Sequence, residues 1–191
     1  MNPDQIYIHP TADVSPQAAI GPCTRIWHQA QVRERACLGA NCIVGKGTYI
    51  DSNVVIGNNV KIQNGVYVYH GVTIEDGVFL GPGVILTNDK LPRAINPDGS
   101  LESDADWKVS PILIRRGASI GAGAVVLPGV TVGEFALVGS GAVVTHDVPA
   151  HGLAYGNPAS LRGYVCPCGQ PLRESGNHQW KCETCNDIYT F

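Results

Sequence analysis

The sequence has few of the bulky residues that normally fill a globular core. Its 191 residues include only three Trp, three Phe and one Met, so something other than large side chains must organise it. No run approaches the roughly 20 apolar residues of a membrane span, and Met1 to Pro10 lacks a basic segment followed by an apolar stretch. A formal charge of -3 and a pI near 6.0 give no electrostatic footprint for nucleic acid or an anionic membrane. We therefore expect a cytoplasmic protein with neither partner.

Disulfides are also not expected to hold this chain together. The seven cysteines are odd in number, and four of them crowd into the last 26 residues. Small secreted domains instead spread an even number of cysteines through the chain. The 23 glycines and 13 prolines indicate many turns, while 44% hydrophobic residues argue against disorder.

What the sequence does contain is a period of six. Every sixth residue from Ile8 to Leu86 is Ile, Leu or Val, and the series resumes from Ile114 to Val144. A second, mostly smaller inward residue follows each one except Leu86 after four positions, with Gly, Asp or Asn frequent at the turns between them. A helix repeats every 3.6 residues and a strand every two, whereas a triangular solenoid with three short strands per coil repeats every six. We predict an all-β parallel β-helix with 18 residues per coil, in which residues 18 apart lie above one another.

The period breaks once, between Leu86 and Ile114. We predict that residues 87–111 leave the solenoid as a long excursion loop, and such loops are usually functional. The predicted domains are a β-helix domain at 1–163 and a cysteine-containing tail at 164–191.

A column of polar residues marks a candidate site at the root of this loop. His70 and Asn88 are one coil apart, and the same column continues back to Ser52 and Glu34. These side chains should point outward on one face, and a histidine there could accept a proton near neutral pH. Tyr67 and Tyr69 flank His70 and are candidate substrate contacts. We expect the other five histidines to be structural or solvated: His9, His28, His146, His151 and His178.

Two segments resemble a known family. The chain from about residue 8 to residue 163 is similar to the left-handed β-helix acyltransferases, in their sugar-nucleotide N-acetyltransferase branch. The discriminating motifs are TND-x-x-PR at 87–93 and GNPA at 156–159, whereas the hexad alone is generic. The left hand is implied by this resemblance only, since crossover rules favour the opposite hand.

The resemblance implies an acetyl-CoA-dependent enzyme of bacterial surface polysaccharide synthesis, such as lipopolysaccharide O-antigen. The first expected acceptor is UDP-2-acetamido-3-amino-2,3-dideoxyglucuronate, and the alternative is a dTDP-3-amino-6-deoxyhexose. Members of the family are homotrimers with sites between subunits, which implies the same here. Asn88 and Asp89 match acceptor-site residues, whereas His70 stands where several relatives carry a glutamate.

These residues suggest a mechanism. Asn88 and Asp89 would orient the amine, and His70 would remove or relay its proton or position the sugar. A backbone N–H near Gly81 or Gly83 would stabilise the oxyanion, and CoA thiolate could take the final proton. The candidates for the CoA pantetheine are Ala124, Ser140 and Ala142, those for its phosphates are Lys108, Arg115, Arg116 and Arg162, and Arg93 is the candidate for the acceptor diphosphate.

The tail carries four cysteines that could form a tetrahedral zinc site: Cys166, Cys168, Cys182 and Cys185. The second pair has regular C-x-x-C spacing, but the first is C-x-C. His178 is a possible substitute ligand, and the alternative is a set of reduced thiols packed in a short tail.

Two other protein classes remain as remote alternatives. A γ-class carbonic anhydrase would use three converging histidines, and His146 and His151 are five residues apart. However, positions 110 and 128, one or two coils earlier, are not histidine. A structural or ice-binding solenoid would show flat threonine ladders and would not need basic residues beside a long loop.

Overall fold

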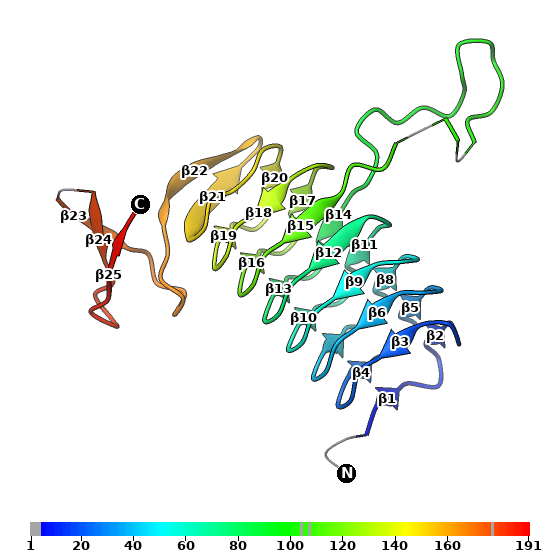
Figure 1. Ribbon diagram of the computed structural model, residues 1–191, viewed down its shortest axis with the longest axis horizontal. Coiled ribbons are helices and arrows are strands. Elements are labelled where there is room, and N and C mark those ends of the chain that lie inside the picture. Colours follow the sequence, from blue (N-terminus) through cyan, green and yellow to red (C-terminus); the bar gives the residue numbers. More distant parts are fainter. Residues whose placement is uncertain (1–4, 104, 107, 177) are drawn as a thin grey trace.

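The predicted triangular solenoid is confirmed by the computed structural model, which describes residues 5–103, 105–106, 108–176 and 178–191. Short parallel strands form three sheets, and the chain turns a corner after each strand (Figure 1). We call this part the prism. The predicted domain 1–163 also contains residues 1–4, 104 and 107, which lie outside the described part of the chain.

Up to β20 the three sheets each collect every third strand, and β21 with the antiparallel β22 completes the first sheet. The first sheet contains β1 (Tyr7–Ile8), β4 (Arg25–Ile26), β7 (Ile43–Val44), β10 (Lys61–Ile62), β13 (Phe79–Leu80), β16 (Ser119–Ile120), β19 (Leu137–Val138), β21 (Gly152–Gly156) and β22 (Ala159–Tyr164). The second contains β2 (Asp13–Val14), β5 (Gln31–Val32), β8 (Tyr49–Ile50), β11 (Tyr67–Val68), β14 (Ile85–Leu86), β17 (Val125–Val126) and β20 (Val143–Val144). The third contains β3 (Ala19–Ile20), β6 (Cys37–Leu38), β9 (Val55–Ile56), β12 (Val72–Ile74), β15 (Ile112–Ile114) and β18 (Thr131–Val132).

Coil stacking follows the predicted register. Tyr67 pairs with Tyr49 in the coil before it and with Ile85 in the coil after it. The sixth-residue aliphatics fill the interior from Ile26 onward, together with the smaller residues four positions later. Ile8 is 42% exposed because it belongs to the first coil, which has a neighbouring coil on one side only.

Two neighbouring turn residues illustrate why the corners are rich in Gly and Asn. A Cβ on Gly57 would lie 2.9 Å from the backbone carbon of Glu75 in the next coil, so only glycine permits this approach. Asn59 instead has a φ of +57°, a left-handed conformation that Asn tolerates better than most residues. The turn residues therefore meet two separate demands of the coil.

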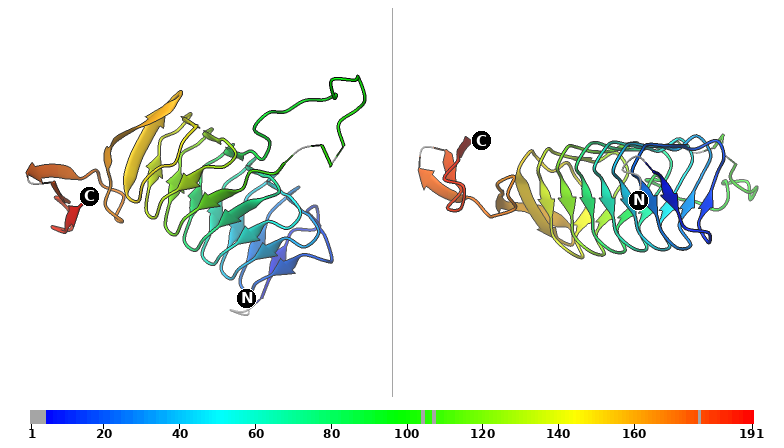
Figure 2. Two further views of the ribbon diagram at one scale, coloured as in Figure 1. Left: turned by 45° about the horizontal axis from the view of Figure 1, so that its top comes forward. Right: turned by 90° about the horizontal axis from the view of Figure 1, so that it is seen from below.

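The excursion leaves the prism where the period predicted it. Strand β14 ends at Leu86 and β15 begins at Ile112, so residues 87–111 project from the side of the prism (Figures 1 and 2). Across it, β12 pairs with β15 and β14 with β17 in unbroken register. The insertion thus interrupts one corner without disturbing the stacking.

Beyond the prism the chain forms a small folded unit instead of an irregular tail. Strands β23 (Arg173–Gly176), β24 (Gln179–Lys181) and β25 (Ile188–Thr190) form an antiparallel sheet. We call residues 164–191 the C-terminal lobe, which lies past the last coil (Figure 2).

In the described part of the chain, no helix has the length and apolar character needed to cross a membrane.

Candidate active site

The predicted column of polar residues lies at the corner between the second and third sheets. Ser52 follows β8, His70 follows β11 and Asn88 follows β14, each in its own coil. Together with Glu34 they line a pocket of about 460 Å³. Its remaining lining residues are Arg33, Arg35, Asp51 and Val109.

Hydrogen bonding fixes the orientation of the His70 ring. Its Nδ1 lies 2.8 Å from the backbone oxygen of Ser52, one coil away. A carbonyl oxygen can only accept, so Nδ1 carries the hydrogen and donates it. In the neutral ring, Nε2 then holds the free lone pair. The site therefore contains an imidazole whose proton-accepting atom is defined by the fold.

A charged network supports the pocket beside this histidine. The buried Asp51 carboxylate accepts hydrogen bonds from Ser52 N at 2.7 Å, His70 N at 3.2 Å and Arg33 Nη1 at 3.2 Å. Arg33 also pairs with Glu34 Oε1 at 2.7 Å. Hydrogen bonds to Tyr49 and Glu34 raise the pKa of Arg33 above its usual value. The pKa of Glu34 is lowered, first by a hydrogen bond from its own backbone and then by Arg33, so it stays ionised at neutral pH.

This network was not predicted from the sequence, although its spacing was visible. Arg33 and Asp51 are 18 residues apart, one coil, as are Arg35 and Asn53, whose side chains hydrogen-bond at 2.8 Å. Opposite charges 18 residues apart indicate the first pair, and a cation one coil from an amide indicates the second. The buried carboxylate of Asp51 connects this second column to His70.

The root of the excursion forms one wall of the pocket. Val109 packs so closely on Gly71 that a Cβ there would lie 2.4 Å from Val109 Cγ1. Gly71 also has a φ of +89°, so the residue after His70 must be glycine for both reasons. Ser110 N donates to Asn88 O at 3.4 Å, which joins the two ends of the excursion.

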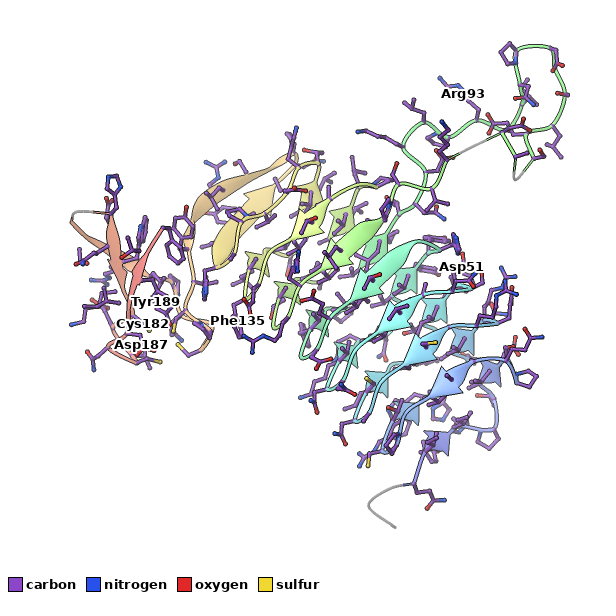
Figure 3. The ribbon with its side chains drawn as sticks, in the orientation of Figure 1. Asp51, Arg93, Phe135, Cys182, Asp187 and Tyr189 are labelled. Atoms are coloured by element: carbon purple, nitrogen blue, oxygen red, sulfur yellow. The ribbon has the colours of Figure 1, made fainter. Side chains whose placement is uncertain are left out.

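Four other predicted site residues do not line the pocket. Tyr67 and Tyr69 stack with ring centroids 6.4 Å apart on the second sheet. Asp89 is half-buried, and its Oδ1 accepts a hydrogen bond from Leu91 N at 2.9 Å. Arg93 is exposed on the excursion (Figure 3), where its Nη1 donates to Pro92 O.

The structure corrects two expectations about cofactor and oxyanion contacts. Ala124 and Ala142 are fully buried inside the prism, because they occupy the small inward position of the hexad, so their side chains cannot touch pantetheine. Of the three residues proposed for that role, only Ser140 is exposed. The N–H groups of Gly81 and Gly83 already donate to Ile120 O and Asn64 O, so neither is available for an oxyanion.

The four candidate cations for CoA phosphates fall into two groups. Arg115 pairs with Glu75 at 3.3 Å, and Arg116 forms an ion pair with Glu134 and lies over the Phe135 ring. Neither Lys108 nor Arg162 pairs with an acid among the described residues. Arg162 lies over the Tyr155 ring at 5.7 Å.

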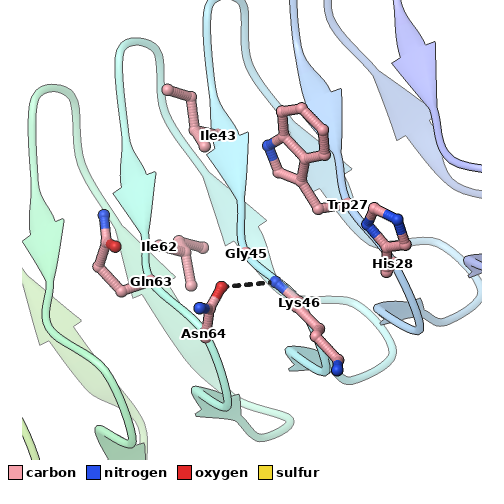
Figure 4. Close-up of a pocket in the computed structure, with 8 residues that line it drawn as sticks. All are labelled: Trp27, His28, Ile43, Gly45, Lys46, Ile62, Gln63 and Asn64. Atoms are coloured by element: carbon pink, nitrogen blue, oxygen red, sulfur yellow. Dashed lines mark hydrogen bonds between the residues drawn. The ribbon is translucent and has the colours of Figure 1, made fainter.

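A second pocket, at a corner of the first sheet, contains a histidine but none of the carboxylates that surround His70. It is lined by Trp27, His28, Lys46 and Asn64 among others (Figure 4). The Asn64 carboxamide is occupied by a hydrogen bond from the Lys46 backbone at 2.8 Å, and the His28 ring stacks on His9. These two histidines stack on each other in the first coils, which agrees with the structural role predicted for them.

The remaining histidines do not converge. His146 Nδ1 lies 2.8 Å from Thr145 Oγ1, whereas His151 Nδ1 lies 3.1 Å from Val165 O. In the described residues, the only group of three or more potential metal ligands is formed by Cys166, Cys168, Cys182 and Cys185. His178, in the turn between β23 and β24, is not part of it.

Comparison with known proteins agrees with this architecture. The bacterial transferase hexapeptide family (six repeats) matches residues 53–88 and 111–146, and the hexapeptide repeat of succinyl-transferase matches residues 35–70. Both models match the six-residue repeat within the prism. It shares its left-handed parallel β-helix with a hexapeptide-repeat acetyltransferase of Vibrio cholerae, at a TM-score of 0.54 and 24% identity over 69% of this chain and 72% of that one.

Two further relatives are named acetyltransferases. The acetyltransferase domain of PglB from Neisseria gonorrhoeae, solved with acetyl coenzyme A, has a TM-score of 0.50 and 24% identity over 82% of this chain and 57% of that one. In sequence, this chain is 47% identical over 79 residues to the dTDP-3-amino-3,6-dideoxy-alpha-D-galactopyranose 3-N-acetyltransferase of Aneurinibacillus thermoaerophilus. That match covers 41% of this chain and 40% of the relative.

Proposed function

We propose that this protein transfers an acetyl group from acetyl-CoA to the amino group of a nucleotide-linked amino sugar. The observation that carries the proposal is the fixed His70 imidazole, whose Nδ1–H is held by Ser52 O and whose Nε2 can accept a proton. It lies in a polar pocket on a fold shared with acetyltransferases.

The reaction needs an uncharged amine near the thioester carbon and a proton acceptor. The amine nitrogen attacks the acetyl carbonyl, a C–N bond forms and the C–S bond to CoA breaks. His70 Nε2 takes the proton that the nitrogen loses, and this proton then passes to the CoA sulfur, so the products are the amide and the free thiol. The Ser52 carbonyl stabilises the imidazolium that exists between these steps.

The favoured acceptor is a dTDP-linked 3-amino sugar. The Aneurinibacillus relative is named for such a substrate, so it ranks above the UDP-linked diamino uronate that the sequence motifs placed first. In either case the product would serve a bacterial surface polysaccharide such as O-antigen.

Roles for the surrounding residues follow from their positions. The Asn88 carboxamide orients the sugar within the pocket, and Asp89 holds the loop that carries Asn88. Tyr67, Tyr69 and Arg93 extend the acceptor site toward the nucleotide. Lys108 and Arg162 are the preferred cations for CoA phosphates, because Arg115 and Arg116 are already paired with glutamates, and Ser140 is the exposed surface for pantetheine.

Residues 1–163, which comprise the prism and its excursion, form the acyltransferase part. The active unit is a homotrimer with sites between subunits. The excursion carries Leu91, Ile95 and Leu101, which are 80%, 56% and 78% exposed in the single chain. Apolar side chains this exposed on a projecting loop favour burial against a neighbouring copy. Light scattering should therefore give three times the chain mass of 20.2 kDa, and a monomer would contradict this assignment.

An acceptor panel tests the proposed activity. Purified protein is incubated with acetyl-CoA and either a dTDP-linked 3-amino-3,6-dideoxyhexose, the UDP-linked 3-amino uronate or acceptor-free buffer, and free thiol is followed with a disulfide reagent. We expect the fastest thiol release with the dTDP sugar and one acetylated sugar per thiol. Faster release with the UDP sugar would reverse the ranking, and no acceptor-dependent release with any amino sugar nucleotide would refute the function.

A further inference from the structure

The C-terminal lobe contains a group of four thiols that the proposed reaction does not use. The Sγ atoms of Cys166, Cys168, Cys182 and Cys185 all lie within 4.8 Å of one another. Cys166 and Cys185 are 3.9 Å apart, and Cys168 and Cys182 are 3.7 Å apart. Zinc–sulfur bonds of about 2.3 Å place the sulfurs of a tetrahedral site about 3.8 Å apart. We propose that these four thiolates bind one Zn²⁺ ion.

The two turns that carry the thiols have the form such a site requires. In the first, Gly169 N donates to Cys166 O at 2.8 Å, and Gly169 has a φ of +87°. In the second, Asn186 N donates to Cys182 O at 2.9 Å, and Cys185 N donates to Cys182 Sγ at 3.4 Å. An N–H directed at a ligating sulfur offsets thiolate charge. The unusual C-x-C spacing therefore still brings both sulfurs to the site.

Hydrophobic packing alone does not account for the folding of the lobe. Among its described residues only Val165, Cys166, Leu172 and Cys182 are buried, and Tyr164, Trp180 and Tyr189 are partly covered around the last three. Units of this size rarely fold without a metal or disulfides. Cys168 and Cys185 are exposed, so burial does not explain why their thiols face the other two. A bound ion explains both observations.

Zinc in the lobe would also order its contact with the prism. Val165 N donates to His151 O at 2.7 Å, and the His151 ring lies 5.6 Å from Phe135 and 5.2 Å from Tyr189. Phe135 lies in the turn between β18 and β19 of the prism, whereas Tyr189 belongs to β25. Both are labelled in Figure 3. The zinc lobe thus contacts the prism at the turn residue His151.

The ion is measured directly on the full-length protein. Metal analysis of protein purified with reductant and without chelator should give one zinc per chain. Cys185→Ser should lose this zinc, whereas Cys37→Ser, which changes an exposed cysteine of the prism, should keep it. Iron as the bound metal, a metal-free protein, or full zinc retention in Cys185→Ser would each overturn the proposal.

A second measurement does not depend on how the variants fold. Wild-type protein is titrated with a mercurial thiol reagent while released zinc is followed with a chromogenic chelator. We expect one equivalent of zinc per chain to be released as the thiols of the lobe react, and cobalt substitution to give the visible absorption of a tetrahedral thiolate site. Two disulfides within the lobe, seen by mass spectrometry of protein purified with reductant, would contradict the site.

Discussion

The prism and the C-terminal lobe achieve order in different ways. In the prism each coil repeats the previous one, so Ile62, Leu80 and Ile120 stack in one fully buried row along the first sheet. In the lobe, which has three short antiparallel strands, the separate hydrophobic cluster contains only three buried residues, two of which are cysteines. The comparison teaches that repetition lets small aliphatic side chains build a continuous core, whereas a short non-repeating segment needs another source of stability.

The largest effect is expected when a buried leucine is truncated to alanine, once in the prism and once in the lobe. Leu80→Ala removes a fully buried side chain and should lower the free energy of unfolding of the prism by about 2–5 kcal/mol. Leu172→Ala should destabilise only the lobe, since Leu172 belongs to the lobe's separate cluster. Denaturant unfolding followed by far-UV circular dichroism, and by lobe Trp180 fluorescence in a background lacking the other tryptophans, separates the regions. If both variants lowered the unfolding free energy of the prism equally, the two regions would not have separate cores.

The next effect lies where the repeat meets the excursion. Asn88→Ala removes the pocket carboxamide, and the loss of about one hydrogen bond to the sugar should raise KM for the acceptor about tenfold. KM for acetyl-CoA should stay unchanged. Asn64→Ala, in the other pocket, is the matched control, and steady-state kinetics with both substrates measures the result. An unchanged acceptor KM would remove the positioning role from Asn88.

The smallest effects are expected for surface ion pairs in both regions. Arg116 pairs with Glu134 one coil away, and Arg173 pairs with Glu183 in the lobe. All four side chains are at least 42% exposed, so Arg116→Gln and Arg173→Gln should each change stability by less than about 1 kcal/mol. Thermal melts measure this. A large loss for Arg116→Gln alone would mean that its contact with the Phe135 ring contributes more than its ion pair with Glu134.

The difference between a repeating prism and a non-repeating lobe also explains what could be predicted from the sequence. The 18-residue coil placed Ser52, His70 and Asn88 in one pocket and predicted the excursion bounds, because in a repeat the spacing fixes the neighbours. The same pattern places Ala124 and Ala142 inside the prism, so the prediction that they contact the cofactor was wrong. In contrast, the lobe's sheet has no period from which to infer strand pairing. The Asp51 network was detectable from its spacing, but its burial depends on packing at the corner.

The central claim is that the pocket at His70 catalyses acetyl transfer to an amino sugar nucleotide. It is tested most directly by the turnover number for thiol release from acetyl-CoA, with the dTDP-linked 3-amino sugar as acceptor, in wild type, His70→Gln and His28→Gln. We expect His70→Gln to lower kcat at least about 100-fold with unchanged thermal stability, and His28→Gln to keep wild-type turnover. A His70→Gln protein with near wild-type kcat would contradict the account.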